Sequence, residues 1–176
     1  GLSESTGPGC VHLGLGNLHK VGAIGVPGCG WKVKITDEND QPVPFGQVGE
    51  LCVKGPGVMV CYYHNPEATA EVLKDGWLHT GDLAREDEDG YYYMVGRKKN
   101  LIILGTGENV SPEELERKLN ACPEVQECVV REMGKKIGAL ICCAEEKQAE
   151  VRAFLTGLNR TLPLYQRITA VEFSAE

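Results

Sequence analysis

The sequence has little positive charge, no long apolar run and no paired-cysteine motif. Its 176 residues include 18 Lys and Arg against 25 Asp and Glu, which gives a formal net charge of −7. Nucleic-acid-binding surfaces are rich in cations that neutralise phosphates, so this balance argues against a nucleic-acid partner. A membrane helix needs roughly 20 apolar residues in succession, and no run approaches that length. We therefore predict a globular protein without a transmembrane segment.

The cysteines have neither the spacing of a zinc site nor that of a redox motif. No two of them form a CxxC pair, and the four histidines supply no matching ligand pair. Most lie among apolar residues. We interpret them as reduced, small core residues of a cytoplasmic protein. The eight are Cys10, Cys29, Cys52, Cys61, Cys122, Cys128, Cys142 and Cys143.

The first half of the chain predicts a β-rich subdomain. Residues 1–30 are dense in glycine, which is typical of loops and short strands. Over residues 31–93, short alternating or β-rich runs are separated by Gly and Pro, the pattern of a small antiparallel barrel or sandwich. An Asn-Pro capping sequence predicts a short helix at residues 65–73. An acidic turn at residues 87–90 and a strand at 91–95 indicate half of a hairpin.

After Gly96 the pattern changes to alternating helices and strands. Ser111-Pro-Glu-Glu114 is a capping box that predicts a helix ending near Ala121. Apolar residues at helical spacing predict a second helix at residues 147–162. Strands are predicted at residues 127–131, 137–143 and 168–173. The fold class is therefore α+β: an antiparallel, β-barrel-like subdomain at residues 1–96, followed by a small α+β domain at residues 97–176.

Two glycine-rich segments of the first half differ in what their residues predict. Gly1-Leu-Ser-Glu4 by itself predicts no more than a Gly-flanked turn whose Ser and Glu cap a helix. Gly76-Trp-Leu-His-Thr-Gly-Asp82 places a lone carboxylate in a loop freed by glycine. Such a carboxylate can accept two hydroxyl hydrogen bonds, as a ribose diol requires. The alternative is an Asp at the end of a strand that caps its own turn.

A third segment joins cations to a glycine-rich loop. Arg97-Lys98-Lys99 is followed by Gly105-Thr-Gly-Glu108, and then by the capping box of the predicted helix. A helix amino terminus, free backbone N–H groups and a guanidinium together suit a phosphate or a nucleotide. Basic residues at a domain junction can also be plain linker charges, and GxG alone is a weak signal.

In order and spacing these segments resemble the AMP-forming adenylation superfamily of acyl-CoA synthetases, firefly-type luciferases and peptide-synthetase adenylation domains. The stretch from Glu50 to Glu116 carries the strongest likeness. The resemblance implies an ATP-dependent acid–thiol ligase that forms AMP. A carboxylic acid would attack the α-phosphorus of ATP with Mg²⁺ as cofactor, and the acyl group would then pass to the thiol of coenzyme A.

The resemblance also implies roles for residues of the first half. Ser3 and Glu4 match the last positions of a Tyr-Gly-x-Thr-Glu motif that holds the adenine and the Mg²⁺-bound phosphates. Asp82 matches the aspartate that binds the ribose hydroxyls. Arg97 matches an arginine that also reaches the ribose. Glu4 is therefore the expected catalytic and metal-associated residue.

For the second half, the resemblance implies a mobile domain. Lys99 matches the hinge residue about which the small domain rotates between the two half-reactions. The loop with Gly105, Gly107 and Glu108 matches the one that contacts the thiol arm of coenzyme A. Cys61 departs from the family, which has glycine there, and this affects only local turn geometry.

The family's phosphate loop would lie before Gly1, and its adenylate-binding lysine would lie after the last residue. We therefore expect the chain to be a carboxy-terminal fragment, inactive alone, with part of the nucleotide site. The Arg-Lys-Lys-Asn-Leu-Ile sequence favours an acyl-CoA synthetase, most like a long-chain fatty acid–CoA ligase. The alternatives are a peptide-synthetase adenylation domain and a non-catalytic nucleotide-binding module.

Overall fold

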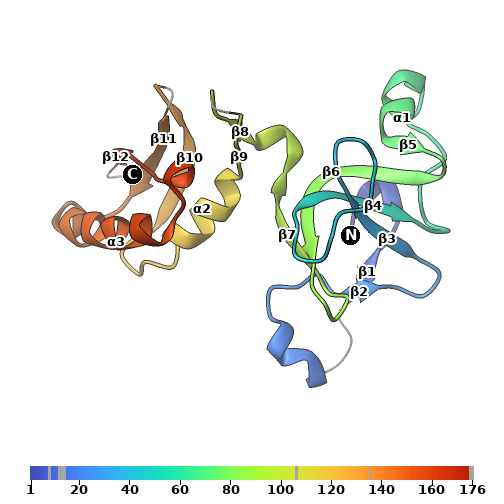
Figure 1. Cartoon of the computed structure of the whole chain (residues 1–176), viewed down its shortest axis with the longest axis horizontal. Helices are drawn as coiled ribbons and strands as arrows, with labels where there is room; N and C mark the ends of the chain where they lie inside the picture. Colours follow the sequence, from blue (N-terminus) through green and yellow to red (C-terminus); the bar gives the residue numbers. More distant parts are fainter. Residues whose placement is uncertain (8, 12–14, 106, 135, 175–176) are drawn as a thin grey trace. The chain divides into compact units, whose positions relative to one another are not determined.

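The chain folds into two units, seen in the computed structural model of Figure 1, which describes residues 1–7, 9–11, 15–105, 107–134 and 136–174. The first unit comprises residues 1–98 and the second residues 99–176. The division falls two residues after the predicted boundary, because Arg97 pairs with Asp82 in the sheet of the first unit. Strand pairing across a hairpin thus fixes Arg97 in that unit.

The first unit is built on one antiparallel sheet. Its strand order is β3 (Lys32–Thr36), β4 (Gly49–Lys54), β6 (Trp77–Glu86) and β5 (Leu73–Lys74). β7 (Tyr92–Arg97) also pairs with β6, which is ten residues long and so has room for two partners on one edge. The core against this sheet contains Ile35, Leu51, Val53, Leu78, Ala84 and Tyr92.

The predicted α+β class and the antiparallel sheet are confirmed, but the sheet is open rather than closed into a barrel. Within the described residues, β3 pairs with β4 alone. The chain after β3 folds back on the outer edge of that strand, where Pro42 bridges Thr36 and the Val43 N–H donates to the Ile35 carbonyl. Proline is tolerated at a sheet edge and blocks further pairing there.

Short elements flank this sheet. The amino-terminal segment contains the 3₁₀ turn η1 (Ser3–Ser5), the paired strands β1 (Cys10–Val11) and β2 (Val26–Pro27), and the 3₁₀ helix η2 (Leu15–Lys20). The predicted helix is α1 (Pro66–Val72), and its cap is Asn65, whose side chain accepts from the Ala68 N–H. The cap explains why this helix could be placed from local sequence.

The second unit combines helices with a three-stranded sheet. β10 (Glu127–Met133) and β11 (Lys136–Cys142) are antiparallel, and β12 (Ala170–Ser174) lies parallel to β11. Two parallel neighbouring strands need a crossover connection, and α3 (Gln148–Thr161) lies in the connection between β11 and β12. Its buried residues are Val151 and Leu155. The helix α2 (Pro112–Leu119) begins after its predicted cap, Ser111, whose hydroxyl accepts from the Glu114 N–H. The remaining elements are the hairpin β8 (Ile102–Ile103) and β9 (Asn109–Val110), and the 3₁₀ turns η3 (Lys98–Asn100), η4 (Glu145–Lys147) and η5 (Leu164–Gln166).

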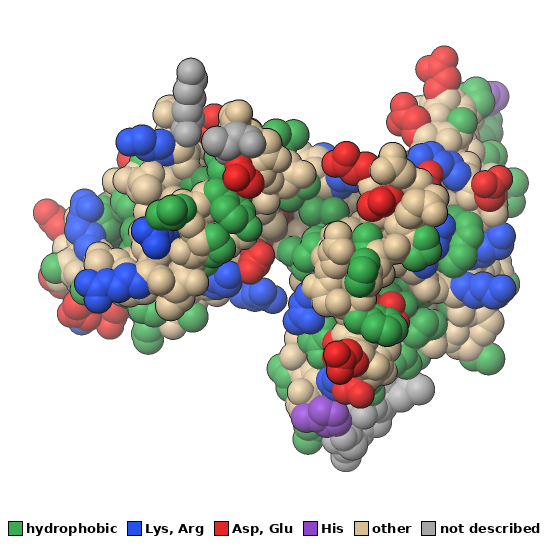
Figure 2. All heavy atoms as spheres, viewed as in Figure 1, with side chains coloured by type: hydrophobic (Ala, Val, Ile, Leu, Met, Phe, Trp, Pro, Cys, Tyr) green, Lys and Arg blue, Asp and Glu red, His purple; other side chains and the backbone are tan. Residues whose placement is uncertain are grey.

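All eight cysteines are free, and their burial only partly follows the prediction. Cys52, Cys122 and Cys143 are buried as small core residues, whereas Cys29 and Cys61 are exposed. On the face drawn in Figure 2, the Lys and Arg side chains are scattered among acidic ones rather than gathered in one patch. Within the described ranges, no helix combines the length and the apolar character needed to cross a membrane.

The acidic turn of the β6–β7 hairpin is held by Asp87. Its Oδ1 accepts from the backbone N–H groups of Asp89 and Tyr91, and its Oδ2 accepts from the Lys20 ammonium at 2.7 Å and the Tyr93 hydroxyl at 3.2 Å. Burial raises the pKa of Asp87, but the hydrogen bonds from Lys20, Tyr91 and Tyr93 outweigh it and lower the pKa to about 2. The turn thereby ties η2 to the sheet.

We predict that Asp87→Asn lowers the urea midpoint of the first unit at pH 7. The native pKa lies below the unfolded value of about 3.9, so the stabilisation is present above that value and is lost as the pH falls towards 2. The difference from wild type should therefore shrink over this range. Both tryptophans, Trp31 and Trp77, lie in the first unit, so their fluorescence reports its unfolding alone.

The matched control is Asp89→Asn on the same turn. Asp89 also contacts Lys20, but its side chain is exposed, so we expect a smaller shift. Equal shifts for the two variants, or a difference at Asp87 that does not change with pH, would contradict the proposed origin of this stability.

Candidate functional site

The segment Thr80–Asp82 forms a bulge in β6. Leu51 of β4 faces all three of these residues, because the pairing shifts register at this point. Gly81 has φ of +69°, a left-handed conformation that glycine adopts without a steric penalty. A bulge bends its strand and redirects the side chains that follow, and here it redirects Asp82.

Side chains replace the ladder hydrogen bonds that the bulge loses. The Thr80 hydroxyl donates to the Leu51 carbonyl at 2.8 Å and accepts from the Asp82 N–H at 3.1 Å. The Gly81 N–H donates to Oε1 of Glu50 at 3.1 Å. Backbone groups that are buried without partners are costly, so this local sequence needs both the threonine hydroxyl and the glutamate.

Asp82 is brought against Arg97 by the register of β6 and β7. The Arg97 Nε lies 2.9 Å from Oδ1 of Asp82, whose side chain is only 10% exposed. Among the described residues, no protein group donates to Oδ2. Burial raises the pKa of Asp82, Arg97 opposes this, and the charges of Glu4 and Glu50 add to the rise. The site therefore holds a carboxylate with one oxygen paired to Arg97 and the other without a donor among the described residues.

The amino-terminal turn lies beside this carboxylate. Glu4 accepts a hydrogen bond from the Tyr62 hydroxyl at 3.0 Å, and its carbonyl accepts from the Met59 N–H. Ser3 is exposed on the same turn. A cavity of about 380 Å³ is lined by residues of this turn together with Asp82 and apolar side chains of the sheet. Its lining residues are Gly1, Leu2, Ser5, Gly9, Cys10, Ile24, Leu51, Val53, Asp82 and Met94.

The remaining predicted residues lie at and after the junction of the two units. Lys99 is exposed, in η3, and is the first residue of the second unit. Gly105, Gly107 and Glu108 are exposed at the tip of the β8–β9 hairpin, where Gly107 has φ of +93°. Thr106 lies outside the described residues. The structure thus groups Ser3, Glu4, Asp82 and Arg97 in the first unit and the others in the second.

The amino terminus of α2 does not offer the anion site that its position suggested. Ser111 caps the helix, and Glu113 and Glu114 occupy its first turn. Glu113 also accepts a hydrogen bond from the Asn100 side chain at 2.7 Å. Two carboxylates at this end already complement the helix dipole and would repel a phosphate.

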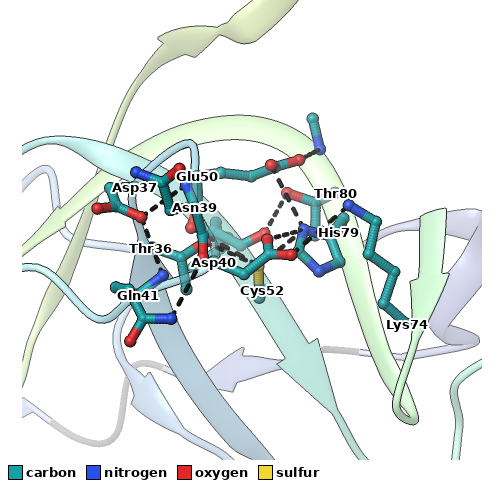
Figure 3. A network of polar contacts seen from close by, with 12 residues as sticks. Thr36, Asp37, Asn39, Asp40, Gln41, Glu50, Cys52, Lys74, His79 and Thr80 are labelled. Carbon is teal, nitrogen blue, oxygen red and sulfur yellow. Dashed lines mark hydrogen bonds and ion pairs between the residues drawn. The ribbon is translucent and has the colours of Figure 1, made fainter. Parts of the chain in front are cut away.

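A buried polar network behind the bulge was missed from the sequence (Figure 3). Oε2 of Glu50 accepts from the Lys98 ammonium at 3.0 Å and lies 3.4 Å from Nδ1 of His79. The same histidine nitrogen lies 3.4 Å from Sγ of Cys52 and 3.6 Å from Oδ1 of Asp40. The available signal was Glu50 itself, the one charge in the otherwise apolar run of residues 49–53. Across the described part of the chain, no group of three His, Cys, Asp or Glu is arranged to hold a metal.

Comparisons with known proteins give a consistent result. Residues 1–63 match the family model described as AMP-binding enzyme. The chain is 39% identical to a feruloyl-CoA synthase from an Amycolatopsis species, over 99% of this chain and 36% of that protein. It is 39% identical to a long-chain-fatty-acid–CoA ligase of Salmonella typhimurium, over 100% of this chain and 32% of that one. The chain thus spans about a third of the length of these relatives.

A solved structure resembles the whole fold. The O-succinylbenzoate coenzyme A synthetase of Bacillus subtilis, in complex with ATP and magnesium ion, superposes with a TM-score of 0.84. The sequence identity is 28%, and the match covers 99% of this chain and 36% of that one.

We predict that Thr80→Val destabilises the first unit by about 1–2 kcal/mol. Valine keeps the shape but removes the donor to Leu51 and the acceptor for the Asp82 N–H. The control is Thr156→Val on the exposed face of α3, where we expect less than about 0.5 kcal/mol. Urea unfolding followed by tryptophan fluorescence measures the Thr80 variant, and urea unfolding followed by circular dichroism, which detects both units, measures the Thr156 variant. Equal small effects would show that the hydroxyl does not hold the bulge.

Proposed function

The chain belongs to the AMP-binding enzyme family, and from this we propose that the protein it forms is an AMP-forming acyl-CoA synthetase. In the first half-reaction, a carboxylate oxygen of the acid attacks the α-phosphorus of ATP, and pyrophosphate leaves. In the second, the thiol of coenzyme A attacks the acyl carbonyl carbon, and AMP leaves. The observation that carries the proposal is the free oxygen of Asp82 beside Arg97 and Glu4.

In this proposal Asp82 binds the ribose of the nucleotide. Its Oδ2 accepts from a ribose hydroxyl, while Arg97 fixes Oδ1 and so orients the carboxylate. Arg97 is half-exposed, which lets its remaining N–H groups reach the same sugar. A carboxylate oriented by an ion pair at this place would help to position the α-phosphorus for attack with little loss of entropy on binding.

Glu4 is the residue that would hold Mg²⁺, and its surroundings fit that role. Mg²⁺ usually takes one or two carboxylates, substrate phosphates and water, so a single glutamate is a sufficient protein contribution. The Tyr62 hydroxyl on Oε1 fixes the side chain and leaves Oε2 for a metal. The ion, when bound, neutralises charge on the phosphates. Ser3 lies one residue before Glu4 in the same 3₁₀ turn, and its exposed side chain would be accessible to the nucleotide.

The second unit would serve the second half-reaction. We assign Lys99 as the hinge because it stands where the two units divide. The hairpin tip with Gly105, Gly107 and Glu108 is exposed and carries no bulky side chain at either glycine, as a loop that contacts the arm of coenzyme A requires. A rotation about the hinge would exchange the surfaces used in each half-reaction.

For the acid, we propose a fatty acid, with an aromatic acid as the alternative. One relative named above is a fatty-acid ligase and another a feruloyl-CoA synthase, and both names specify coenzyme A rather than a carrier protein. The free cysteines support a reducing compartment such as the cytoplasm. The peptide-synthetase and non-catalytic alternatives are outcomes of the experiment below.

The test is acid-dependent ATP–pyrophosphate exchange by the whole protein over fatty, aromatic and amino acids, followed by addition of coenzyme A. We expect exchange with a fatty acid, release of a thioester, and an increase of about 10- to 100-fold in the KM for ATP on Asp82→Asn, because hydrogen bonds to a charged group are lost. Asp87→Asn, on the same hairpin but with its carboxylate turned to Lys20, should leave exchange unchanged.

Each other outcome has a distinct meaning. Exchange with amino acids alone would identify a peptide-synthetase adenylation domain. Absence of exchange with every acid would refute the proposed activity and favour the nucleotide-binding module. Normal ATP dependence in the Asp82 variant would refute the ribose assignment.

We further predict that Lys99→Pro spares adenylate formation and slows thioester formation about tenfold or more. Proline fixes φ near −65° and restricts the preceding residue, so it limits rotation at this point. Lys99→Ala removes the side chain without restricting the backbone, so it should keep both rates. Equal losses of the two half-reactions in the proline variant would contradict the hinge assignment, and single-turnover measurements of each step distinguish the outcomes.

A further inference from the structure

Glu50 is the one charged residue in the buried stretch Gly49–Val53 of β4. Its exposed fraction is 8%, and β4 is buried along Gly49–Val53. Burying a carboxylate is costly unless hydrogen bonds and an opposite charge compensate for the lost water. A position that keeps such a group therefore has partners that stabilise it.

The partners of Glu50 come from two segments far away in the sequence. The Gly81 N–H donates to Oε1 at 3.1 Å and the Lys98 ammonium to Oε2 at 3.0 Å. Gly81 is the residue immediately before Asp82. Lys98 is the last residue of the first unit and stands between Arg97 and Lys99. One carboxylate thus joins the bulge to the end of β7.

The rest of the network keeps this carboxylate oriented and ionised. Nδ1 of His79 lies 3.4 Å from Oε2, the oxygen that also accepts from Lys98, and is itself in contact with Cys52 and Asp40. Burial raises the pKa of Glu50, but the hydrogen bonds from Lys98, Gly81 and His79 outweigh it, so the pKa lies below its ordinary value. These contacts favour the ionised form of the carboxyl group.

We propose that Glu50 is a positioning residue that holds two parts of the synthetase in place. Its carboxylate holds the nucleotide-binding bulge through the Gly81 N–H and the first-unit side of the hinge through the Lys98 ammonium. The inference rests on the proposed function. It adds that the two half-reactions depend on one side chain that touches neither substrate. With Lys98 tied to the sheet, rotation of the second unit begins at Lys99 rather than within β7. Because the Gly81 N–H is hydrogen-bonded to the same carboxylate, Asp82 keeps its orientation while the second unit moves.

Three substitutions separate the two contacts of Glu50, which are called the bulge arm (to the Gly81 N–H) and the hinge arm (to the Lys98 ammonium). Lys98→Met removes only the hinge arm. Glu50→Gln keeps an oxygen that can accept from Gly81 but loses the charge that holds Lys98. Glu50→Ala removes both arms. In the whole protein, we expect the first two to slow thioester formation about threefold or more, with an unchanged KM for ATP. Glu50→Ala should in addition raise that KM about tenfold.

The double variant Glu50→Gln with Lys98→Met provides the sharpest comparison. If the two residues act as one contact, its loss should equal that of either single variant. The matched control is Lys74→Met: Lys74 faces Asp40 at the other end of the network, and its side chain is 49% exposed against 50% for Lys98. It should leave both half-reactions unchanged. Independent losses that multiply in the double variant would overturn the proposal.

A second measurement does not depend on activity. Amide hydrogen exchange of the nucleotide-free whole protein should be faster at residues 98–100 in Glu50→Gln and Lys98→Met, and faster at Gly81 as well in Glu50→Ala. The same exchange rates as wild type at both places would overturn the proposal, even if the enzyme is active. If wild type shows no pyrophosphate exchange, the proposed function fails, while this measurement still decides whether Glu50 holds the two segments.

Discussion

The bulge at Thr80–Asp82 is the constraint on which the candidate site depends. A regular β6 would satisfy its backbone through β4, whereas the bulged strand places three residues against Leu51 and leaves N–H groups without ladder partners. The sequence supplies substitutes from Thr80 and Glu50. The Thr-Gly-Asp order is therefore a folding requirement as well as the proposed basis of binding: the hydroxyl holds the turn, the glycine permits it, and the turn orients the aspartate.

The bulge also explains how the basic run at the junction is used. From the sequence, Arg97, Lys98 and Lys99 form one cluster of cations. In the structure the first two each serve a different carboxylate, Arg97 pairing with Asp82 and Lys98 with Glu50. Two acidic groups near each other in a poorly hydrated sheet would repel, and each cation lowers the cost of its own partner. Two of the three cations of this run thus form ion pairs within the first unit.

Local signals were predictable and long-range ones were not. Asn65 and Ser111 act on amides three residues ahead, so both helices they cap could be placed from sequence alone. The open sheet could not be distinguished from a barrel, because the fold-back of Pro42 on β3 is a tertiary event. Glu50 was missed for the same reason: its donors lie 31 and 48 residues away, and nothing in the Gly-Glu-Leu-Cys-Val pattern points to them.

The division of residues between the two units has a mechanistic consequence. Glu4, Asp82 and Arg97, the residues proposed to face the nucleotide, all belong to the first unit, and the hairpin proposed to face coenzyme A belongs to the second. The amino terminus of α2 is occupied by its own acidic residues, so it is a poor candidate for a second phosphate contact. The segments proposed to bind the nucleotide and to face coenzyme A are then joined through the peptide bond between Lys98 and Lys99. In the proposed mechanism, the second unit can change which of its surfaces faces the adenylate without disturbing the first-unit residues that hold the adenylate. This requires that Lys98, at the end of the first unit, stays fixed.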